Sequence, residues 1–375
     1  MKILIGADLV PTKTNFHIFS NGNINELIGD ELASLFSSVD YKIFNLEVPL
    51  VDELNPISKA GPNLVAPTNT IKGIKKLGVD FLCLANNHIL DQGKEGLLST
   101  IKILKENEIS YAGVGSREQA NKPHFFTIDD LRIGIYCCAE HEFSIVDNRD
   151  IGANPFDYLN TLDDIVDIRK ECDYLIVLYH GGKEHYRYPS PNLQKTCRKI
   201  VDKGADLVVC QHSHCVGCEE KYMNKTIVYG QGNFIFDYKN DECWKDSLLI
   251  LLDIQVNSIK LDYIPIEKNG NSIKKSHNEN ILKGFYHRSN LIKNEEEVER
   301  LYISYCLNNI NNYINSIQDP IYNSLVFKVL NKLTKGYLKK KIIKNYINKK
   351  RNTLINKIEC EAHRELIITA LKNIK

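Results

Sequence analysis

Short apolar segments alternate with amphipathic ones across the first two thirds of the chain. Residues 2–8 (KILIGAD), 41–48, 80–86, 173–180 and 205–212 are rich in apolar and β-branched residues, which predicts five buried strands. Between them, apolar residues recur at helical spacing in residues 24–36, 71–78, 95–107, 161–172 and 192–204. This alternation predicts an α/β domain whose strands are largely parallel.

Other segments break this alternation. Residues 124–140 (HFFTIDDLRIGIYCCAE) contain two strand-like runs around Asp129-Asp130, which predicts a hairpin. Residues 226–236, 246–256 and 259–270 add strands with no helix between them. We therefore expect two sheets packed face to face with helices outside them, a mixed α/β (α+β) architecture.

The C-terminal quarter has a different composition. From Gly284 onward the chain is rich in Asn, Ile and Lys at helical periodicity, so we predict a division into residues 1–283 and a basic helical segment, 284–375. Residues 321–358 carry eleven Lys or Arg and no Asp or Glu, in a chain of net charge +1.

This basic segment has three candidate uses. We favour helices that pack on the core with solvated lysines; the alternative is an apolar face that lies on an anionic bilayer surface. Nucleic-acid binding is the weakest option, because Tyr322, Tyr337 and Tyr346 interleave with the lysines but no nucleic-acid motif accompanies them.

Composition indicates an ordinary globular chain. Its 375 residues are 43% apolar and 25% charged, and no apolar run is long enough to span a bilayer. The apolar N-terminal run reaches Asp8 too soon for a signal peptide, so we expect a cytoplasmic protein, with docking to the inner membrane face as a variant. The eleven cysteines are irregularly spaced and several lie in apolar runs, which favours reduced thiols.

Polar residues follow the predicted strands at the points where the apolar runs end. An isolated Asp there is often a helix N-cap, and an isolated His is more often a hydrogen-bonded structural residue. Together, however, the carboxylate, amide and imidazole groups form a ligand set that suits one or two divalent Mn, Fe or Zn ions better than Mg or Ca. The ligand set takes one Asp, one Glu, one Asn and three His from the polar residues at these strand ends, which are Asp8, Asn45, Glu47, Asn86, Asn87, His88, His180, His212 and His214.

Three of these residues have a specific expected geometry. Residues two apart on a strand point to the same side, so His212 and His214 are predicted to face one cavity. The two oxygens of Glu47 suit it to bridge two cations about 3.5–4 Å apart.

Several motifs together resemble one family. GAD, NLEVP, NNHILD, HGGKEHY, HSH and YGQGNFIFD occur in the order typical of CapA-like poly-γ-glutamate capsule synthesis proteins, within the calcineurin-like metallophosphoesterase superfamily. The resemblance covers residues 1–265. It implies a four-layer αββα sandwich with a metal site at the sheet edge, followed here by a C-terminal helical extension.

The resemblance also implies roles for individual residues. The implied metal ligands are Asp8, Glu47, Asn87, His180, His212 and His214. His88 resembles the catalytic histidine that protonates the leaving group or steadies transition-state charge, and Asp91 is placed to orient it. The predicted substrate contacts are Asn45, Asn86, Gln231 and Asn233. Glu184 and Tyr188, in the loop after His180, are further predicted contacts, and the alternative is that they are ordinary surface loop residues.

Two positions depart from the superfamily pattern. Metallophosphoesterases usually begin D-x-H, whereas Val10 stands at the histidine position, so the first metal site has one ligand fewer. Glu47 stands where phosphoesterases usually carry Asp, as is usual for CapA-like proteins.

Cys215 and Cys218 form a C-x-x-C motif next to the two histidines. A zinc knuckle would need a second ligand pair, and a redox motif would need a thioredoxin-like setting; neither is found in the sequence. Buried free thiols are the favoured interpretation.

The leading functional hypothesis is a metal-dependent hydrolase that acts on a phosphoester, or on an amide or other bond of a surface-polymer precursor. The alternative is a non-catalytic assembly factor that keeps the fold and binds a glutamate polymer or synthesis partners. A nucleic-acid phosphodiesterase is a third, weaker hypothesis.

Overall fold

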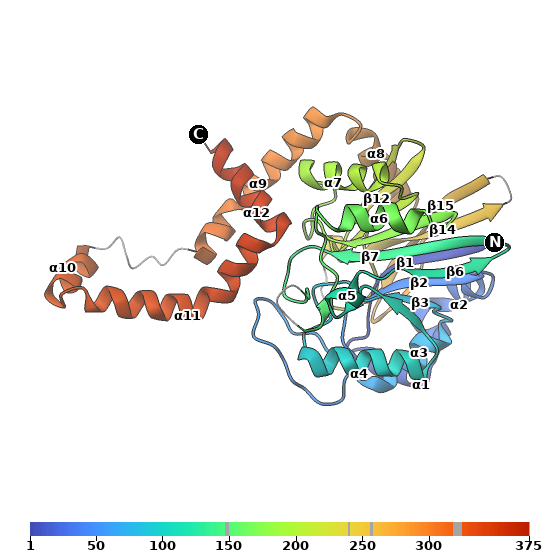
Figure 1. Cartoon of the computed structure of the whole chain (residues 1–375), viewed down its shortest axis with the longest axis horizontal. Coiled ribbons are helices and arrows are strands. Elements are labelled where there is room, and N and C mark those ends of the chain that lie inside the picture. Colours follow the sequence, from blue (N-terminus) through green and yellow to red (C-terminus); the bar gives the residue numbers. More distant parts are fainter. Residues whose placement is uncertain (147–149, 239–240, 256–257, 318–324, 375) are drawn as a thin grey trace.

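Two β-sheets lie face to face in the computed structural model (Figure 1), which describes residues 1–374 except 147–149, 239–240, 256–257 and 318–324. The first sheet has the order β16-β15-β14-β1-β2-β3-β4, with β13 beside β1, and the second has the order β11-β12-β10-β9-β7-β6. The first sheet comprises β1 (Lys2–Val10), β2 (Tyr41–Leu46), β3 (Phe81–Cys83), β4 (Ser110–Ala112), β13 (Asn233–Phe236), β14 (Asp246–Gln255), β15 (Ser258–Asn269) and β16 (Ser272–Lys275). The second comprises β6 (His124–Ile128), β7 (Leu131–Ala139), β9 (Tyr174–His180), β10 (Leu207–Gln211), β11 (Val216–Tyr222) and β12 (Lys225–Gln231).

Helices cover the outer faces of both sheets. Against the first sheet lie α1 (Phe16–Asn21), α2 (Ile24–Ser37), α3 (Ile71–Lys76) and α4 (Gly93–Glu106). Against the second lie α6 (Thr161–Arg169) and α7 (Pro191–Asp202). The smaller elements are α5 (Arg117–Ala120) and the strand pair β5 (Val114–Gly115) and β8 (Gly152–Ala153).

Side-chain alternation along the strands explains the layering. In β2, Ile43 packs between the two sheets, whereas Phe44 packs outward against the helices. In β9, Leu178 packs between the sheets and Val177 packs outward toward α6 and α7. Strands that are apolar on both faces must be packed on one side against the other sheet and on the other side against helices. The predicted four-layer αββα sandwich is therefore confirmed.

The predicted hairpin over residues 124–140 is also confirmed. β6 and β7 pair antiparallel, and both Asp129 (φ 50°) and Asp130 (φ 64°) have the positive φ of a tight hairpin turn. β7, however, also pairs parallel with β9. Its carboxyl end therefore lies at the same sheet edge as that of β9.

The C-terminal segment is helical, as predicted, and its later part projects from the layered body (Figure 1). It contains α8 (Glu279–Leu291), α9 (Glu295–Ile317), α10 (Leu325–Leu333), α11 (Tyr337–Glu359) and α12 (Glu361–Asn373). α10 and α11 are separate helices because Lys335 (φ 51°) and Gly336 (φ 85°) have left-handed backbone conformations that break the helix between them. The predicted boundary at residue 284 falls inside α8, and the division into two domains stays a prediction.

Parts of two predicted segments, Val256 and residues 321–324, lie outside the described residues. Within the described part of the chain, no helix combines the length and the apolar character that crossing a bilayer requires.

Candidate metal centre

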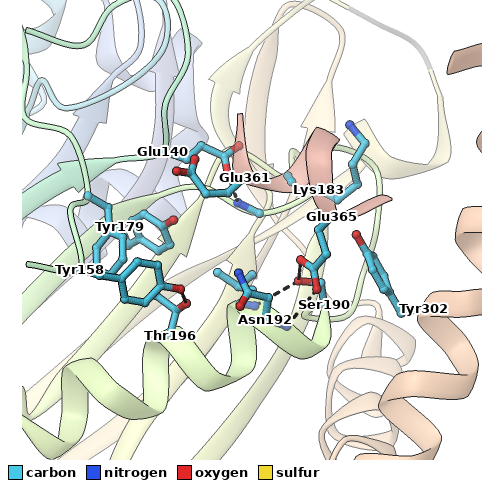
Figure 2. A pocket seen from close by; sticks show the side chains of 14 residues that line it. Glu140, Tyr158, Tyr179, Lys183, Ser190, Asn192, Thr196, Tyr302, Glu361 and Glu365 are labelled. Atoms are coloured by element: carbon cyan, nitrogen blue, oxygen red, sulfur yellow. Dashed lines mark hydrogen bonds between the residues drawn. The ribbon is translucent and has the colours of Figure 1, made fainter. Parts of the chain in front are cut away.

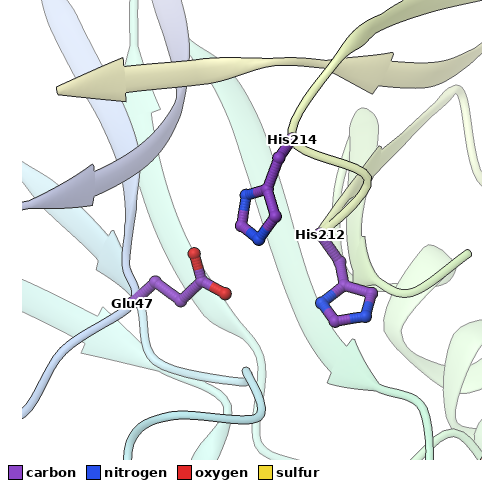
Figure 3. A group of neighbouring side chains, drawn as sticks. All are labelled: Glu47, His212 and His214. Atoms are coloured by element: carbon purple, nitrogen blue, oxygen red, sulfur yellow. The ribbon is translucent and has the colours of Figure 1, made fainter. Parts of the chain in front are cut away.

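The carboxyl ends of parallel strands bring the predicted ligands to one place. Asp8 on β1 lies opposite Asn45 on β2, and His180 on β9 lies opposite Gln211 on β10, immediately before His212. Figure 3 shows Glu47, which follows β2, pointing across the space between the two sheets toward His212 and His214. Ligand atoms of these three buried residues lie within 4.8 Å of one another.

Glu47 is a buried carboxylate that lacks hydrogen-bond donors. It is 0% exposed, and neither of its oxygens has a hydrogen-bond partner in the described part of the chain. Burial, and then the neighbouring charge of Asp8, raises the pKa of Glu47 to about 8. A buried carboxylate without donors costs free energy, which a bound cation would offset.

His180 lies at the centre of the group. Its Nε2 is 3.0 Å from Asn87 Oδ1, 3.1 Å from His212 Nδ1 and 3.3 Å from Glu47 Oε1. One ring proton cannot serve three acceptors at once. Burial lowers the pKa of His180 to about 4 and that of His212 to about 3, which keeps both imidazoles neutral, the form that binds metals.

Asp8 and His214 form a buried ion pair on the other side of the group. Asp8 Oδ2 lies 3.4 Å from His214 Nδ1, and Asn45 Nδ2 donates to Asp8 Oδ1 at 2.8 Å. Burial would lower the pKa of His214, but Glu47 and then Asp8 outweigh it and raise that pKa to about 10. Burial likewise opposes ionisation of Asp8, but His214 and His180 bring its pKa below the ordinary value. The metal-free pair is therefore charged.

The backbone explains how His212 and His214 reach the same space. The two histidines converge as predicted. They do not do so as residues two apart on a strand, because β10 ends at Gln211 and both lie in the following loop. Both have positive φ, 89° at His212 and 55° at His214. Such a backbone is costly for residues other than glycine and is typical of functional sites.

His88 and Asp91 form the predicted pair, and a lysine joins them. His88 Nδ1 lies 2.5 Å from Asp91 Oδ2, which also accepts a hydrogen bond from the backbone N–H of Leu64 at 2.6 Å. Lys59 forms an ion pair with Asp91 Oδ1, and its side chain is 2% exposed. Lys59 was not predicted, since it lies in an irregular loop with no pattern to mark it.

Four of the predicted substrate contacts lie among the ligand candidates. Asn233 Oδ1 is 2.8 Å from His214 Nδ1, and its Nδ2 has no partner among the described residues. Burial opposes ionisation of Glu184, but the charge of Lys183, and then those of His212 and His214, bring its pKa below the ordinary value. Asn45 and Asn86 are paired inside the site, where Asn86 Nδ2 donates to Asn45 Oδ1 at 3.1 Å.

The other two predicted substrate contacts, Gln231 and Tyr188, make contacts that stabilise the fold. Gln231 Nε2 donates to the backbone oxygens of Ile5 and Leu248, at 3.0 and 3.1 Å. Tyr188 packs against Tyr186, with ring centroids 5.7 Å apart. The structure does not bring these two side chains to the imidazoles.

Two carboxylates at the site escaped the sequence analysis. Glu140 and Glu142 follow β7, and Glu140 Oε1 lies 3.4 Å from His212 Nε2. Glu142 Oε2 accepts a hydrogen bond from Asn87 Nδ2 at 2.7 Å. The sequence AEHE places both carboxylates directly after an apolar run, the same pattern that marked the other ligands. They were overlooked because that run was interpreted only as part of a hairpin.

The donor set fits a divalent cation. Asp8 Oδ2 and both Glu47 oxygens are buried without hydrogen-bond partners among the described residues, and the neutral imidazoles of His180 and His212 lie beside them. Val10 is buried and apolar, so it supplies no ligand. All eleven cysteines are described and free, and Cys215 and Cys218 are buried, as predicted.

The family model described as bacterial capsule synthesis protein PGA_cap matches residues 8–238. The capsule biosynthesis protein CapA of Bacillus anthracis is 31% identical over 247 residues, which are 60% of this chain and 58% of that protein. The PGA biosynthesis protein CapA of Bacillus subtilis is 27% identical over 244 residues, covering 62% of this chain and 63% of that protein. The matched region thus spans less than two thirds of either relative.

Solved structures give more distant matches. A novel phosphatase from Mycoplasma pneumoniae aligns with a TM-score of 0.45 and 15% identity, over 76% of this chain and 98% of that one. A 5'-nucleotidase precursor from Thermus thermophilus aligns with a TM-score of 0.39 and 15% identity, over 70% of this chain and 54% of that one.

Proposed function

The chain belongs to the bacterial capsule synthesis protein (PGA_cap) family, and from that premise we propose that it is a metal-dependent, phosphoesterase-like hydrolase in capsule or surface-polymer synthesis. One observation carries the proposal: the buried Glu47 carboxylate, without donors, faces imidazoles at the carboxyl edge of the strands. Neither Glu47 oxygen has a hydrogen-bond partner among the described residues, and the imidazole of His180, 3.3 Å away, is neutral. A cation would provide the missing partner.

The residues that would hold one or two ions are Asp8, Glu47, Asn87, His180, His212 and His214, with Mn, Fe or Zn as the ions that suit such a set. When bound, a divalent cation would supply electrophilic activation of the substrate and of water. A phosphoester is the proposed substrate class, and an amide of a surface-polymer precursor is the alternative.

His88 is the proposed general acid. Nδ1 is directed at Asp91, which orients the ring and leaves Nε2 available to a substrate. As a general acid His88 would act as the imidazolium and give its Nε2 proton to the leaving group. Lys59 balances the charge of Asp91 and fixes its carboxylate from the other side. His88 also lies near enough to Glu47 to affect its pKa, so this acid stands beside the candidate metal centre.

Two variants test the proposal. His214→Ala removes a ligand of the centre around Glu47, so the metal bound at that centre and the Mn-stimulated hydrolysis of generic phosphomonoesters and phosphodiesters should both be lost. His88→Ala should keep its metal and lose about 10²- to 10⁴-fold in kcat, the usual contribution of a general acid. The exposed His277→Ala is the matched control. A wild-type chain that binds no divalent metal and hydrolyses none of these esters refutes the proposal.

The second candidate function is a non-catalytic assembly factor that binds a glutamate polymer or synthesis partners. The apolar Val10 at a usual ligand position favours it, as does the pairing of Asp8 with His214 in the metal-free chain. Binding of poly-γ-glutamate that survives both His88→Ala and His214→Ala, in a chain without turnover, would support this function.

We also infer an anionic bilayer as a partner of α10 and α11. At this projecting end (Figure 1), Val329, Leu333 and Tyr337 are 57%, 73% and 68% exposed. Lysines flank these apolar side chains, within a stretch that has no acidic residue between 321 and 358. Exposed apolar groups beside clustered cations are what an anionic membrane surface binds, and a cytoplasmic chain would meet that surface at the inner membrane face.

A further inference from the structure

The last helix docks on the edge of the sheets that carries the candidate metal centre. Glu361, at the start of α12, accepts hydrogen bonds from the His141 backbone N–H at 2.9 Å and from its Nδ1 at 2.8 Å. One turn further, Glu365 accepts hydrogen bonds from Ser190 Oγ at 2.5 Å and from the Asn192 backbone N–H at 3.0 Å. Figure 2 shows Glu361 beside Glu140 and Glu365 facing Ser190.

A mixed group of ligand atoms lies under this helix. Cys360, His363 and Glu142 place a sulfur, a ring nitrogen and a carboxylate oxygen within 4.8 Å of one another. His363 Nε2 is 3.6 Å from Glu142 Oε1, and Cys360 Sγ is 3.5 Å from Glu140 Oε1. Cys360 is 1% exposed, and the His363 and Glu142 side chains are 17% and 7% exposed.

We propose that Cys360, His363 and Glu142 form a second metal site, specific for zinc-class divalent ions, that fastens α12 over the strand edge. The thiolate and imidazole ligands distinguish this site from the candidate centre around Glu47, whose ligands are oxygen and imidazole only. Glu140, beside the sulfur, is the fourth candidate donor of a closed tetrahedral site.

The local backbone favours these ligands. Cys360 is the N-cap of α12 and His363 is its third residue, so the C-x-x-H spacing directs both side chains toward the same side of the first turn. The start of a helix favours a thiolate. The other ring nitrogen of His363, Nδ1, lies 2.7 Å from the Tyr313 hydroxyl, which orients Nε2 toward Glu142.

The charges around the site are mixed, with an excess of carboxylates. Glu140, Glu142 and Glu361 face it, and the nearby cations are Lys183 and Lys357. Burial, and then these two lysines, lowers the pKa of His363 to about 3, so the ring is neutral and able to bind a metal. Burial and the carboxylates raise the pKa of the Cys360 thiol, so the metal-free thiol keeps its proton and releases it when the metal binds.

Cobalt substitution of the full-length protein tests the site directly. Thiolate-bound Co²⁺ gives a strong charge-transfer band in the near ultraviolet, and the centre around Glu47 contains no cysteine that could produce one. We expect the band in the wild type and in His214→Ala, and its loss in Cys360→Ser and in His363→Gln. Cys243→Ser is the matched control that should keep it. Added Zn²⁺ should displace the cobalt and abolish the band.

A second experiment tests whether zinc holds α12 in place. Zn²⁺ should slow proteolysis and amide exchange of residues 360–373 severalfold in the wild type and in His214→Ala, but not in Cys360→Ser. The absence of a thiolate band from cobalt-loaded wild type, or its persistence in Cys360→Ser, overturns the site. Equal zinc protection in wild type and Cys360→Ser overturns the fastening role. Neither outcome depends on hydrolase activity.

Discussion

Replacing Glu47 with glutamine separates a metal-binding role from a structural one. In the metal-free chain, the pKa of Glu47 rises from 4.5 to about 8, mainly through burial and then through the charge of Asp8. At pH 7 the native state therefore holds a proton that the unfolded state releases. The gap between 4.5 and pH 7, at about 1.36 kcal/mol per pKa unit, corresponds to about 3 kcal/mol of lost stability.

Glutamine has the same shape and no charge, so Glu47→Gln should stabilise the metal-free protein by at most about 3 kcal/mol. This value is an upper bound, because the amide of a buried glutamine carries N–H donors that also need partners. The destabilisation of the folded state by Glu47 is absent below pH 4.5 and grows as the pH rises to about 8. The stability advantage of the variant should therefore increase across that window.

Bound metal should offset most of this difference in stability. At a metal concentration about 100 times its Kd, the wild type should gain about 2.7 kcal/mol, whereas Glu47→Gln should gain little because it has lost a ligand. Urea unfolding, in chelator and in Mn²⁺, measures both effects, with the exposed Glu53→Gln as the control. If Glu47→Gln is less stable than the wild type in chelator, or gains as much from metal, Glu47 is not the ligand we infer.

Two further predictions concern Lys59 and the projecting helices. Lys59→Met leaves Asp91 buried without its cation, so the free energy of unfolding in urea should fall by about 3–5 kcal/mol. The kcat should also fall while the amount of bound metal is unchanged. The control is the exposed Lys13→Met, and a loss of stability no greater than that of the control would contradict the ion pair. Leu333→Asp should reduce cosedimentation with anionic vesicles about tenfold without affecting hydrolysis, whereas equal sedimentation with neutral vesicles would rule out the membrane as partner.

The residues of the candidate centre that follow directly from the order of the strands could be predicted from the sequence. Asp8, Asn45 and His180 follow apolar runs, and parallel strands bring such ends to one edge whatever the loops do. The same rule applies to Glu140, which was missed because its strand was assigned only to a hairpin. β7 has both an antiparallel and a parallel neighbour, and local periodicity cannot show the second.

Contacts made by loops and by distant segments were not predictable. Lys59 lies in an irregular loop, and its burial depends on the tertiary position of Asp91, 32 residues away. Cys360 contacts Glu140 across 220 residues, and no local pattern specifies such a pair. The positive φ of His212 likewise results from the tight loop after β10 and not from strand alternation.

The two proposed metal sites are connected through Glu140, which lies against both Cys360 and His212, and through Glu142. Glu142 is a proposed zinc ligand, and its Oε2 holds Asn87 Nδ2, while Asn87 Oδ1 faces His180 in the first centre. A cation at Glu142 would fix this amide and direct its oxygen toward His180, so occupancy of the C-terminal site should tighten binding at the first. Residues 8–238 supply the first centre and Glu142, whereas Cys360 and His363 lie beyond the family match. The C-terminal helices of this chain would thus control a site that the family fold provides.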